Sequence, residues 1–520
     1  DALRADLAEV LERHAIGLDA RRPAAVARRH QSGMRTVREN LAELLDQGSF
    51  IEYGALALAA QRRRKSVAEL LQLSPADGLV AGLGSINAAE FGEQAARCMV
   101  LAYDYTVFAG TQGVMNHKKT DRMLQLAERW RLPLVLLAEG GGGRPSDTDW
   151  PGVAGLDNLT FIGLARLSGL VPLVGLVAGR CFAGNAALLG CCDVIIASAN
   201  TSLGMAGPAM IEGGGLGKFA AEEVGPVSVQ GPNGVIDILV ADEAEAVAVA
   251  KRYLSYFQGP QADWQCADQR LLRQLIPENR LRVYDIRQLI ETLADQGSVL
   301  ELRRQFAPGM LTALVRIEGR AFGLLANNPQ HLGGAIDAAG GDKAARFMQL
   351  CDAFDLPMIS LCDTPGFMVG PEAEKTGTVR HVSRMFVTAA SLTVPFFTLV
   401  LRKGYGLGAQ AMAAGSFHAA LFTVAWPSGE FGAMGLEGAV RLGFAKELAA
   451  IADPAERQRR FDSMVAAAYE HGKGLNMASF LEIDDVIDPA DSRRWLVRGL
   501  AATPAPAPRQ GKKRPFIDTW

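Results

Sequence analysis

RENLAELLDQGSFIEY (38–53) and RQLIETLADQGSVLEL (287–302) are two versions of one segment. In each, apolar residues at helical spacing precede the turn DQGS, and a short alternating strand follows it. Identical residues in the two versions, such as Glu52 and Glu301, are 249 residues apart. A shared helix–turn–strand pattern at one constant separation indicates that the chain contains the same unit twice.

Two further pairs of segments follow in the same order. KTDRMLQLAERWRLPLVLLAEGGG (119–142) matches KAARFMQLCDAFDLPMISLCDTPG (343–366), with each residue 224 positions from its counterpart. VPLVGLVAGRCFAGNAALLG (171–190) matches VPFFTLVLRKGYGLGAQAMAAG (394–415), and we expect its register to slip by one residue between strand and turn. Repeated strand–turn–helix units are typical of α/β architecture. The sequence therefore predicts two homologous α/β domains, residues 1–280 and 281–520.

Composition excludes several classes of protein. The 520 residues carry a formal net charge of −3, whereas a nucleic-acid platform normally has a basic excess. The seven cysteines form no CxxC pair and the seven histidines show no metal-ligand spacing, so we expect free thiols, a reducing cytoplasmic location and no metal site. The charge-free stretch 385–401 is divided by Pro395, which favours a helix followed by a buried strand over a membrane span.

Two turns rich in small residues, RCFAGNAALLG (180–190) and RKGYGLGAQAMAAG (402–415), each follow a predicted buried strand. Glycine and alanine permit close packing of a helix on a strand, which is a sufficient structural explanation for one such turn. The alternative is that the amides at the start of each helix stabilise a developing negative charge. Because the turns are equivalent in the two halves, we favour the catalytic explanation.

These segments resemble a known family. EGGGGR (139–144), NNPQHLGGAID (327–337), DTPGF (363–367) and AWPSGEFGAMGLEGAV (425–440) are similar to the carboxyltransferase component of biotin-dependent acyl-CoA carboxylases. The resemblance covers nearly the whole chain. Its long opening and its tail KRPFIDTW (513–520) look closest to carboxyltransferase modules within single-chain, multidomain acyl-CoA carboxylases.

The resemblance implies a fold and a set of partners. The fold would be two tandem crotonase-like domains of the ClpP/crotonase spiral type. The cofactor would be biotin, borne on a separate carrier domain, and the other substrate a CoA thioester. Biotin carboxylase and biotin carboxyl carrier domains or subunits would be the partners. The chain would form a homo-oligomer, typically a hexamer built as a trimer of dimers, in which the N-half of one subunit faces the C-half of another.

The resemblance also implies two groups of site residues. On the acyl-CoA side, main-chain amides would hold an enolate oxygen, and nearby residues would bind the substrate: Ala183 and Gly184 for the amides, and Gly141, Gly142, Gly143, Arg144, Lys118 and Gln410 for the substrate. On the biotin side, amides would hold the ureido oxygen beside residues that shape the entrance: Leu407 and Gly408 for the amides, and Asp363, Pro365, Gly366, Phe367 and Tyr405 for the entrance.

Several alternatives remain open at the level of sequence. Arg144 could contact a CoA phosphate or a neighbouring acid, and Glu139 and Asp363 could cap loops or act directly. The basic runs 61–66 and 117–119 could attract phosphates or form solvated surface. A biotin-dependent acyl-CoA decarboxylase, which runs the same half-reaction backwards, and a non-catalytic assembly subunit are the competing functions.

Overall fold

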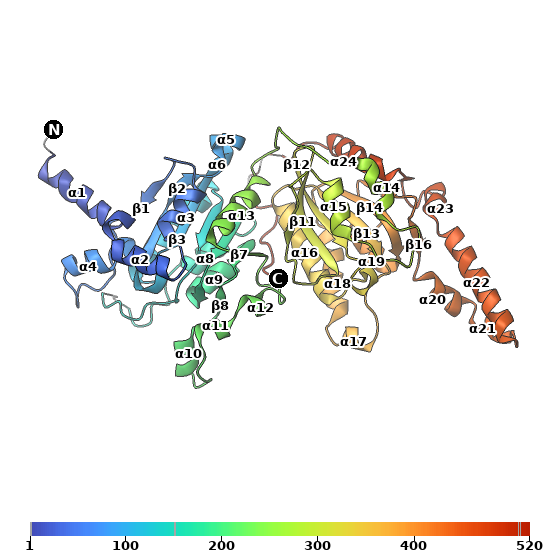
Figure 1. The fold of residues 1–520 in the computed structure, drawn as a ribbon, viewed down its shortest axis with the longest axis horizontal. Helices are drawn as coiled ribbons and strands as arrows, with labels where there is room; N and C mark the ends of the chain where they lie inside the picture. The colour runs from blue at the N-terminus through green and yellow to red at the C-terminus, as the bar shows by residue number, and fades with distance from the viewer. Residues whose placement is uncertain (1–2, 150–151, 508, 510) are drawn as a thin grey trace. The chain divides into compact units, whose positions relative to one another are not determined.

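The computed structural model describes residues 3–149, 152–507, 509 and 511–520, which form two compact units. One unit runs to Gly259 and includes the tail segment Gly511–Thr519; the other begins at Pro260 and includes Trp520 (Figure 1). Residues 260–280 thus group with the second unit. The assignment of residues 1–280 to acyl-CoA and 281–520 to biotin stays a prediction.

The first unit is built on a sheet in the order β1-β2-β3-β4-β5-β7-β9. The pairs β1–β2 and β2–β3 are antiparallel, and from β3 onward the strands are parallel. A second, two-stranded sheet pairs β6 with β8. The strand bounds are β1 Ile51–Tyr53, β2 Leu79–Ser85, β3 Arg97–Tyr103, β4 Leu134–Leu137, β5 Leu173–Val177, β6 Arg180–Phe182, β7 Val194–Ser198, β8 Ser202–Gly204 and β9 Ile238–Val240.

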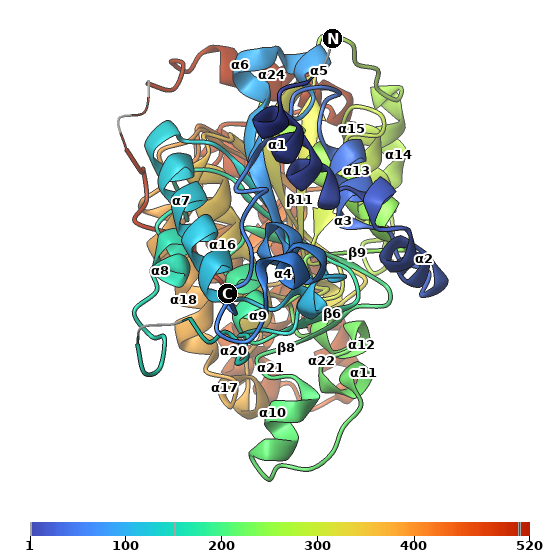
Figure 2. The same cartoon turned by 90° about the vertical axis from the view of Figure 1, so that its left-hand side faces the viewer.

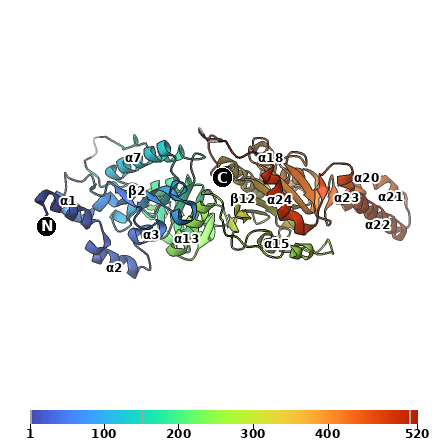
Figure 3. The ribbon, with the colours of Figure 1, turned by 90° about the horizontal axis from the view of Figure 1, so that it is seen from above.

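Helices cover both faces of this sheet. In Figure 3, α7 lies on one side of β2, and α3 and α13 lie on the other. Figure 2 shows α10 projecting from the unit, in the segment that follows β8. The helix bounds are α1 Ala5–Ile16, α2 Pro23–Gln31, α3 Val37–Leu44, α4 Val67–Leu73, α5 Ala88–Phe91, α6 Glu93–Ala96, α7 Val114–Trp130, α8 Thr160–Ala165, α9 Gly184–Gly190, α10 Pro208–Gly213, α11 Ala221–Val224, α12 Val227–Gln230 and α13 Glu243–Ser255.

The second unit repeats this plan. Its sheet has the order β10-β11-β12-β13-β14-β15-β17, with β16 beside the end of β14. Again the first two pairs are antiparallel and the others parallel. The strand bounds are β10 Leu300–Leu302, β11 Met310–Ile317, β12 Arg320–Asn327, β13 Met358–Thr364, β14 Phe396–Tyr405, β15 Phe422–Ala425, β16 Glu430–Gly432 and β17 Asp485–Val486.

The helices of the second unit also lie on both sides of its sheet, with α18 and α15 on opposite sides of β12 in Figure 3. Helix α16 packs on α18 and on strands β11 and β12. The helix bounds are α14 Leu272–Leu275, α15 Ile286–Leu293, α16 Ala338–Ala353, α17 Pro371–Glu374, α18 Thr378–Ala389, α19 Gly406–Met412, α20 Leu436–Gly443, α21 Ala445–Ala450, α22 Pro454–His471, α23 Gly474–Ser479 and α24 Ser492–Ala501.

Side-chain contacts confirm that the repeated segments are equivalent. Arg38 pairs with Glu52 at 3.0 Å, and Arg287 pairs with Glu301 at 2.6 Å. Each DQGS turn follows its helix and precedes its strand, as the pattern predicts. The predicted helix and buried strand at 385–401 are α18 and β14. Among the residues that the structure describes, no helix is long and apolar enough to cross a membrane.

The cysteines are all free thiols, as their spacing predicts. Cys98, Cys181, Cys192, Cys351 and Cys362 are buried, and Cys191 and Cys266 are half-buried. Burial raises the pKa of Cys98 to about 12, so this thiol stays protonated at neutral pH. These cysteines behave as small apolar residues of the two cores.

Candidate functional site

Each unit carries a turn at the carboxyl end of its central strands. In the first unit, residues 140–143 follow β4, and the Gln112 amide donates to the Gly142 carbonyl at 2.7 Å. The Arg144 amide in turn donates to the Gln112 carbonyl at 2.8 Å. The Gly143 amide takes no part in this ladder, and a Cβ at Gly143 would meet nothing within 4 Å. Gly143 is therefore exposed, and its amide is left out of the backbone ladder.

The second unit repeats this arrangement 224 residues later. The Ile336 amide donates to the Gly366 carbonyl at 3.0 Å, and the Met368 amide donates to the Ile336 carbonyl at 2.8 Å. The Phe367 amide corresponds to that of Gly143 and is likewise outside the ladder. The Phe367 ring is held edge-on to Phe386, with centroids 6.2 Å apart. Two predicted binding residues, Gly143 and Phe367, are thus structural equivalents.

The helix starts that face these turns show a register different from the predicted one. Phe182 pairs with Gly204, and Tyr405 pairs with Gly432, each as the last residue of its short parallel ladder. The next residues, Ala183 and Gly406, both have positive φ, at 52° and 58°. Phe182 and Tyr405, the last strand residues, are 223 positions apart in the sequence. Ala183 and Gly406 keep the same separation, so the alignment of the strands continues through the turn. The predicted slip of one residue is wrong, because the short flanking strands β8 and β16 hold both turns in the same alignment.

This alignment changes which amides are open. The Ala183 amide donates to the Gly204 carbonyl at 3.1 Å, so it is not an open donor, contrary to the sequence prediction. Gly184 is the first residue of α9, where an amide has no intrahelical acceptor. In the second unit Leu407 corresponds to Gly184, and Gly408 follows it within the first turn of α19.

Glycine is required where the two parts of each site meet. A Cβ on Gly142 would lie 2.6 Å from the Ala183 Cβ and 3.5 Å from the Gly184 nitrogen. A Cβ on Gly408 would lie 2.7 Å from the Gly366 Cα and 3.1 Å from the Phe367 nitrogen. Because a Cβ cannot approach other atoms closer than 3.0 Å, both positions require a residue without a side chain. The structure thus brings the strand-end glycines and the helix-start amides together within each unit.

One residue of the first site has no counterpart among the predicted residues. Asn185 is fully buried, and its Oδ1 accepts from the Gly142 amide at 2.9 Å while its Nδ2 donates to the Gly110 carbonyl at 3.3 Å. The side chain thus ties the 140–143 turn to α9. An asparagine among small residues at a helix start was the available signal, because asparagine there commonly bonds to backbone.

The charged candidates are mostly held by structural partners. Arg144 pairs with Asp77 at 2.5 Å and lies 3.5 Å from Asp147, so of its two alternatives the structure shows the neighbouring acid. Lys119 is buried and donates to the carbonyls of Gly54 and Leu79. It does not belong to an exposed basic surface, which corrects the reading of 117–119 as one.

Lys118 and Gln410 each line a cavity. Exposed Lys118 on α7 borders a cavity of about 710 Å³ in the first unit, together with Arg62. Gln410 borders a cavity of about 640 Å³ in the second unit, beside Gly404 and Gly406. The wall of this second cavity is mainly apolar and aromatic, with the residues Phe417, Phe431, Met477 and Phe480.

The remaining biotin-side candidates surround the second turn. The buried Asp363 carboxylate accepts from the Tyr284 hydroxyl at 2.8 Å and pairs with Arg402 at 3.1 Å. Pro365 is exposed, and Gly366 lies under Gly408. Tyr405 is buried, and its hydroxyl donates to Glu430 at 2.9 Å. Asp363 and Tyr405 therefore shape the turn through internal bonds.

No group of three or more His, Cys, Asp or Glu side chains suited to a metal occurs in the described ranges. What each site offers is a set of main-chain donors at a short helix start, and in the second unit Gly406 of this helix start also lines the 640 Å³ cavity. Such donors are preorganised and keep their protons at neutral pH, so they suit a developing oxyanion.

The chain matches known proteins over nearly its whole length. The family model described as "Carboxyl transferase domain" matches residues 28–514. The biotin-dependent long chain acyl-coenzyme A carboxylase beta4 subunit of Mycobacterium tuberculosis is 30% identical over 516 residues, which cover 95% of this chain and 92% of that protein.

Two solved structures share the fold. A single-chain, multi-domain long-chain acyl-CoA carboxylase is 60% identical with a TM-score of 0.91, and the match covers 96% of this chain but 49% of that one. This chain thus spans about half the length of that carboxylase. The transcarboxylase 12S hexamer with bound methylmalonyl-coenzyme A is 30% identical, with a TM-score of 0.83 and 99% of both chains covered. The fold is therefore two tandem crotonase-like domains, and the chain belongs to the carboxyl transferase domain family, the carboxyltransferases of biotin-dependent acyl-CoA carboxylases.

Proposed function

We propose that this carboxyltransferase moves a carboxyl group from biotin to the α-carbon of an acyl-CoA, with one of its two backbone sites for each reactant. The observation that carries the proposal is the duplicated turn: Gly143 with Gly184 in one unit, and Phe367 with Leu407 in the other. A reaction in which negative charge develops on two carbonyl oxygens needs two such sites.

The first unit holds the acyl thioester. The amides of Gly143 and Gly184 donate to the thioester oxygen as it gains enolate character, and the positive end of the α9 dipole adds to this stabilisation. Gly141 and Gly142 let the turn pack closely, with Gly142 against Ala183, and this packing places the Gly143 amide beside the helix start. Lys118 and Arg62, at the 710 Å³ cavity, attract the CoA phosphates.

The second unit holds biotin, which supplies the carboxyl group and, once decarboxylated, a base for the α-proton. The amides of Phe367, Leu407 and Gly408 donate to the ureido oxygen. Asp363 keeps this turn in place through Arg402, and Pro365 and Gly366 form the entrance. Because decarboxylated biotin would accept the α-proton, the chain needs no side-chain base at the reacting carbon.

In the proposed assembly, the cavity beside Gln410 on one subunit takes the acyl chain of the thioester that the first unit of another subunit holds. Its aromatic and methionine wall, of Phe417, Phe431, Met477 and Phe480, offers more apolar surface than a two- or three-carbon acyl group can cover. Burial of one methylene stabilises a bound chain by about 0.8 kcal/mol. Acyl groups longer than propionyl, including those that the similar long-chain carboxylases use, are therefore the proposed substrates.

The proposed assembly is a homo-oligomer, a hexamer like that of the transcarboxylase 12S, in which the N-half of one subunit meets the C-half of another. Biotin carboxylase and a biotin carrier, as domains or subunits, are the proposed partners. Seven free thiols favour a cytoplasmic location, since oxidising compartments select for disulfides.

The test is carboxyl transfer itself. Initial rates are measured with a biotinylated carrier and acetyl-, propionyl-, butyryl- and long-chain acyl-CoA, and in reverse with malonyl- or methylmalonyl-type CoA esters and free biotin. An initial rate of carboxyl transfer that increases with the length of the acyl group supports the proposal. No transfer with any acyl length, from a protein that is folded and oligomeric, contradicts it and favours an assembly subunit.

A further inference from the structure

A carboxylate stands directly before each of the two turns, half-buried at Glu139 and fully buried at Asp363. Glu139 precedes residues 140–143, and Asp363, 224 residues later, precedes residues 364–367. The backbone carbonyl of each packs on a glycine with positive φ: a Cβ on Gly110 would lie 2.4 Å from the Glu139 oxygen, and one on Gly334 would lie 2.2 Å from the Asp363 oxygen. Both acids are thus fixed at the same point of the duplicated fold.

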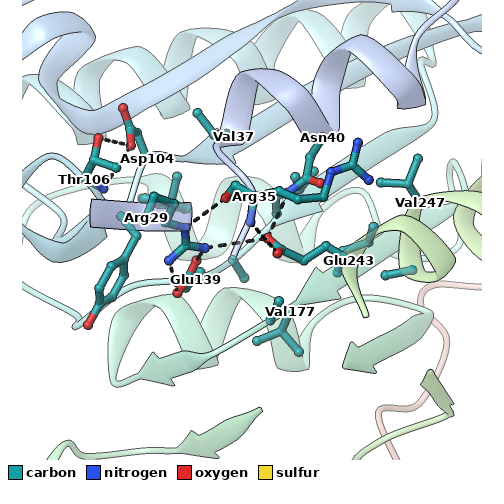
Figure 4. A pocket seen from close by; sticks show the side chains of 17 residues that line it. Arg29, Arg35, Val37, Asn40, Asp104, Thr106, Glu139, Val177, Glu243 and Val247 are labelled. Carbon is teal, nitrogen blue, oxygen red and sulfur yellow. Dashed lines mark hydrogen bonds and ion pairs between the residues drawn. The ribbon is translucent and has the colours of Figure 1, made fainter. Parts of the chain in front are cut away.

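Glu139 is clamped by an arginine from the N-terminal part of the chain. The guanidinium of Arg29, on α2, donates to both carboxylate oxygens. Nη1 donates to Oε1 at 2.9 Å, and Nη2 donates to Oε2. Arg29 is itself oriented by the Arg35 carbonyl, which accepts from its Nε at 2.8 Å. Figure 4 shows Arg29 between this carbonyl and the two acids Glu139 and Glu243.

On its other side the Glu139 carboxylate touches the approach to the helix start. A Cβ on Gly179 would lie 2.5 Å from the Glu139 Oε1. Gly179 is followed by β6, whose first residue, Arg180, accepts from the Gly140 amide at 2.9 Å through its carbonyl. A movement of the carboxylate therefore displaces the 140–143 turn, because Glu139 is bonded to Gly140. It also displaces β6, the strand before Gly184, through the contact with Gly179.

The charges around Glu139 leave its ionised form weakly supported. Arg29 is the cation in contact with it, but that guanidinium also lies 3.6 Å from Glu243, at the start of α13. Asp104, in the loop after β3, contributes a further negative charge, although Arg22 pairs with it at 2.8 Å. Burial raises the pKa of Glu139 to about 7. The hydrogen bonds and charge of Arg29 oppose this rise, and the negative charges of Glu243 and Asp104 add to it.

The remaining neighbours do not add a second cation. Arg35 points its guanidinium to Glu43 at 2.5 Å and uses its amide to donate to Glu243. The Cys181 thiol, on β6, is buried and neutral because desolvation raises its pKa. Tyr105 lies under the Arg29 guanidinium, 5.5 Å from ring centroid to Cζ.

A small cavity gives protons access to this cluster. It measures about 40 Å³, enough for a few water molecules, and Arg29, Glu139 and Glu243 line it. The buried Asn40 Oδ1 and Arg35 Nη1 have no hydrogen-bond partner among the described residues, and water in this cavity would satisfy them. The cluster thus has room for water beside the carboxylate, and the Glu139 side chain is itself 13% exposed.

We propose that Glu139 is a positioning residue for the acyl-site turn, that Arg29 holds it in place, and that protonation of its carboxylate loosens the turn and slows carboxyl transfer. The catalytic part of this inference rests on the proposed function; the effect on the turn does not. Neutralised Glu139 keeps at most weaker hydrogen bonds to Arg29, since charge-assisted bidentate pairs are the stronger ones.

The corresponding acid of the second unit has more partners. Asp363 faces Arg402 at 3.1 Å and Lys403 at 3.3 Å, and the Tyr284 hydroxyl donates to it as well. Two cations and a hydroxyl hold this carboxylate, whereas one shared cation holds Glu139. The two sites are therefore equivalent in geometry but differ in the number of cations that hold the acid in place.

The experiment compares wild type, E139Q, R29K and R29A in the full chain, with E52Q as a matched control. Glu52 is a partly buried carboxylate of the same unit that pairs with Arg38 and lies outside the site. We expect the kcat of the wild type to fall below about pH 7 while KM changes little, because the turn holds the transition state more than the ground state. E139Q should show a kcat lowered roughly 10- to 100-fold at pH 8. Its kcat should no longer fall below pH 7, so the acid limb of the pH profile should be absent.

Two further measurements separate positioning from a general loss of structure. R29K should retain more activity than R29A, and millimolar guanidinium should partly restore R29A. Hydrogen exchange of the peptide that covers residues 138–147 should be faster in E139Q, and in wild type at pH 6 after correction for the intrinsic rate, but unchanged in E52Q.

The outcomes are distinguishable. Unchanged exchange at 138–147 in E139Q, or an acid limb that persists in E139Q, overturns the inference. An inactive wild type whose turn still loosens in E139Q overturns the proposed function and leaves the positioning of the turn intact. Equal losses in E139Q and E52Q would show only a structural effect and would also overturn it.

Discussion

Asn185 and Gly408 occupy equivalent positions in the two units, two residues beyond the positive-φ residues Ala183 and Gly406. In the first unit the Asn185 side chain bridges the helix start and the strand-end turn. In the second unit Gly408 lets the two backbones touch directly. One duplicated fold thus joins the same two elements in two ways, and each way can be tested separately.

The first prediction concerns the direct contact. Gly408→Val places a Cβ 2.7 Å from the Gly366 Cα and 3.1 Å from the Phe367 nitrogen, which must push the biotin-side amides apart. We expect turnover to fall roughly 10²-fold or more, the loss typical of one missing oxyanion donor, while the oligomer persists. Steady-state kinetics and light scattering measure the two effects. Gly443→Ala is the control, since a Cβ there meets nothing within 4 Å, and normal turnover in G408V would remove this turn from the mechanism.

The second prediction concerns the bridge. Asn185→Ala removes the acceptor for the Gly142 amide and the donor to Gly110, and it leaves a small void. We expect kcat to fall about 10- to 100-fold with a smaller change in KM, because the acyl-side amides lose their alignment. Rates with one acyl-CoA over a range of concentrations give the split. Asn233→Ala, at an exposed asparagine bonded to Gln230, should leave both constants unchanged; an equal loss there would refute the assignment.

The third prediction concerns chain length. Gln410→Leu replaces a polar group at an otherwise mainly apolar cavity. We expect kcat/KM for long acyl-CoA to rise relative to propionyl-CoA by a few-fold, in line with about 0.8 kcal/mol per buried methylene. Competition between two acyl-CoA esters in one reaction reports the ratio directly. If the ratio stays constant in both Q410L and Phe480→Ala, the cavity does not hold the acyl chain.

The fourth prediction concerns stability. Burial lowers the pKa of Lys119 to about 8, and its ammonium donates to two backbone carbonyls. The folded state therefore binds fewer protons than the unfolded state between about pH 8 and the ordinary lysine pKa near 10.5, so the free energy of unfolding contributed by Lys119 rises with pH across this window. Lys119→Met should destabilise the protein by about 1–3 kcal/mol at pH 7, because two buried carbonyls lose their donor.

Denaturant unfolding of wild type and K119M from pH 7 to pH 10 measures both effects. Above pH 8, the free energy of unfolding of the wild type should rise relative to that of K119M. Lys118→Met, at the exposed neighbour, should show neither effect. A pH-independent difference would mean that Lys119 has an ordinary pKa in the fold.

Local pattern was sufficient for the secondary structure and the duplication, whereas the crotonase-like fold was implied by the family resemblance. The helix before each DQGS turn, the buried strands β4 and β13, and the split at Pro395 all follow from the spacing of apolar residues and from turn chemistry, which act over a few positions. The duplication added that the two units share one topology, because two copies of one pattern fold alike. The glycine turns could be located for the same reason, and Gly143 and Phe367, which the resemblance named, lie at equivalent positions in them.

Contacts between distant segments were beyond the reach of pattern. Arg29 and Glu139 are 110 residues apart, and nothing near either one indicates that they pair. The Ala183 amide is occupied by Gly204, and Arg144 by Asp77, because strands and loops remote in sequence pack beside them. Hydrogen bonding and desolvation depend on which groups are neighbours in space, and so the choice of open amides, and the charge state of the acid behind them, follows from the packing of the whole unit.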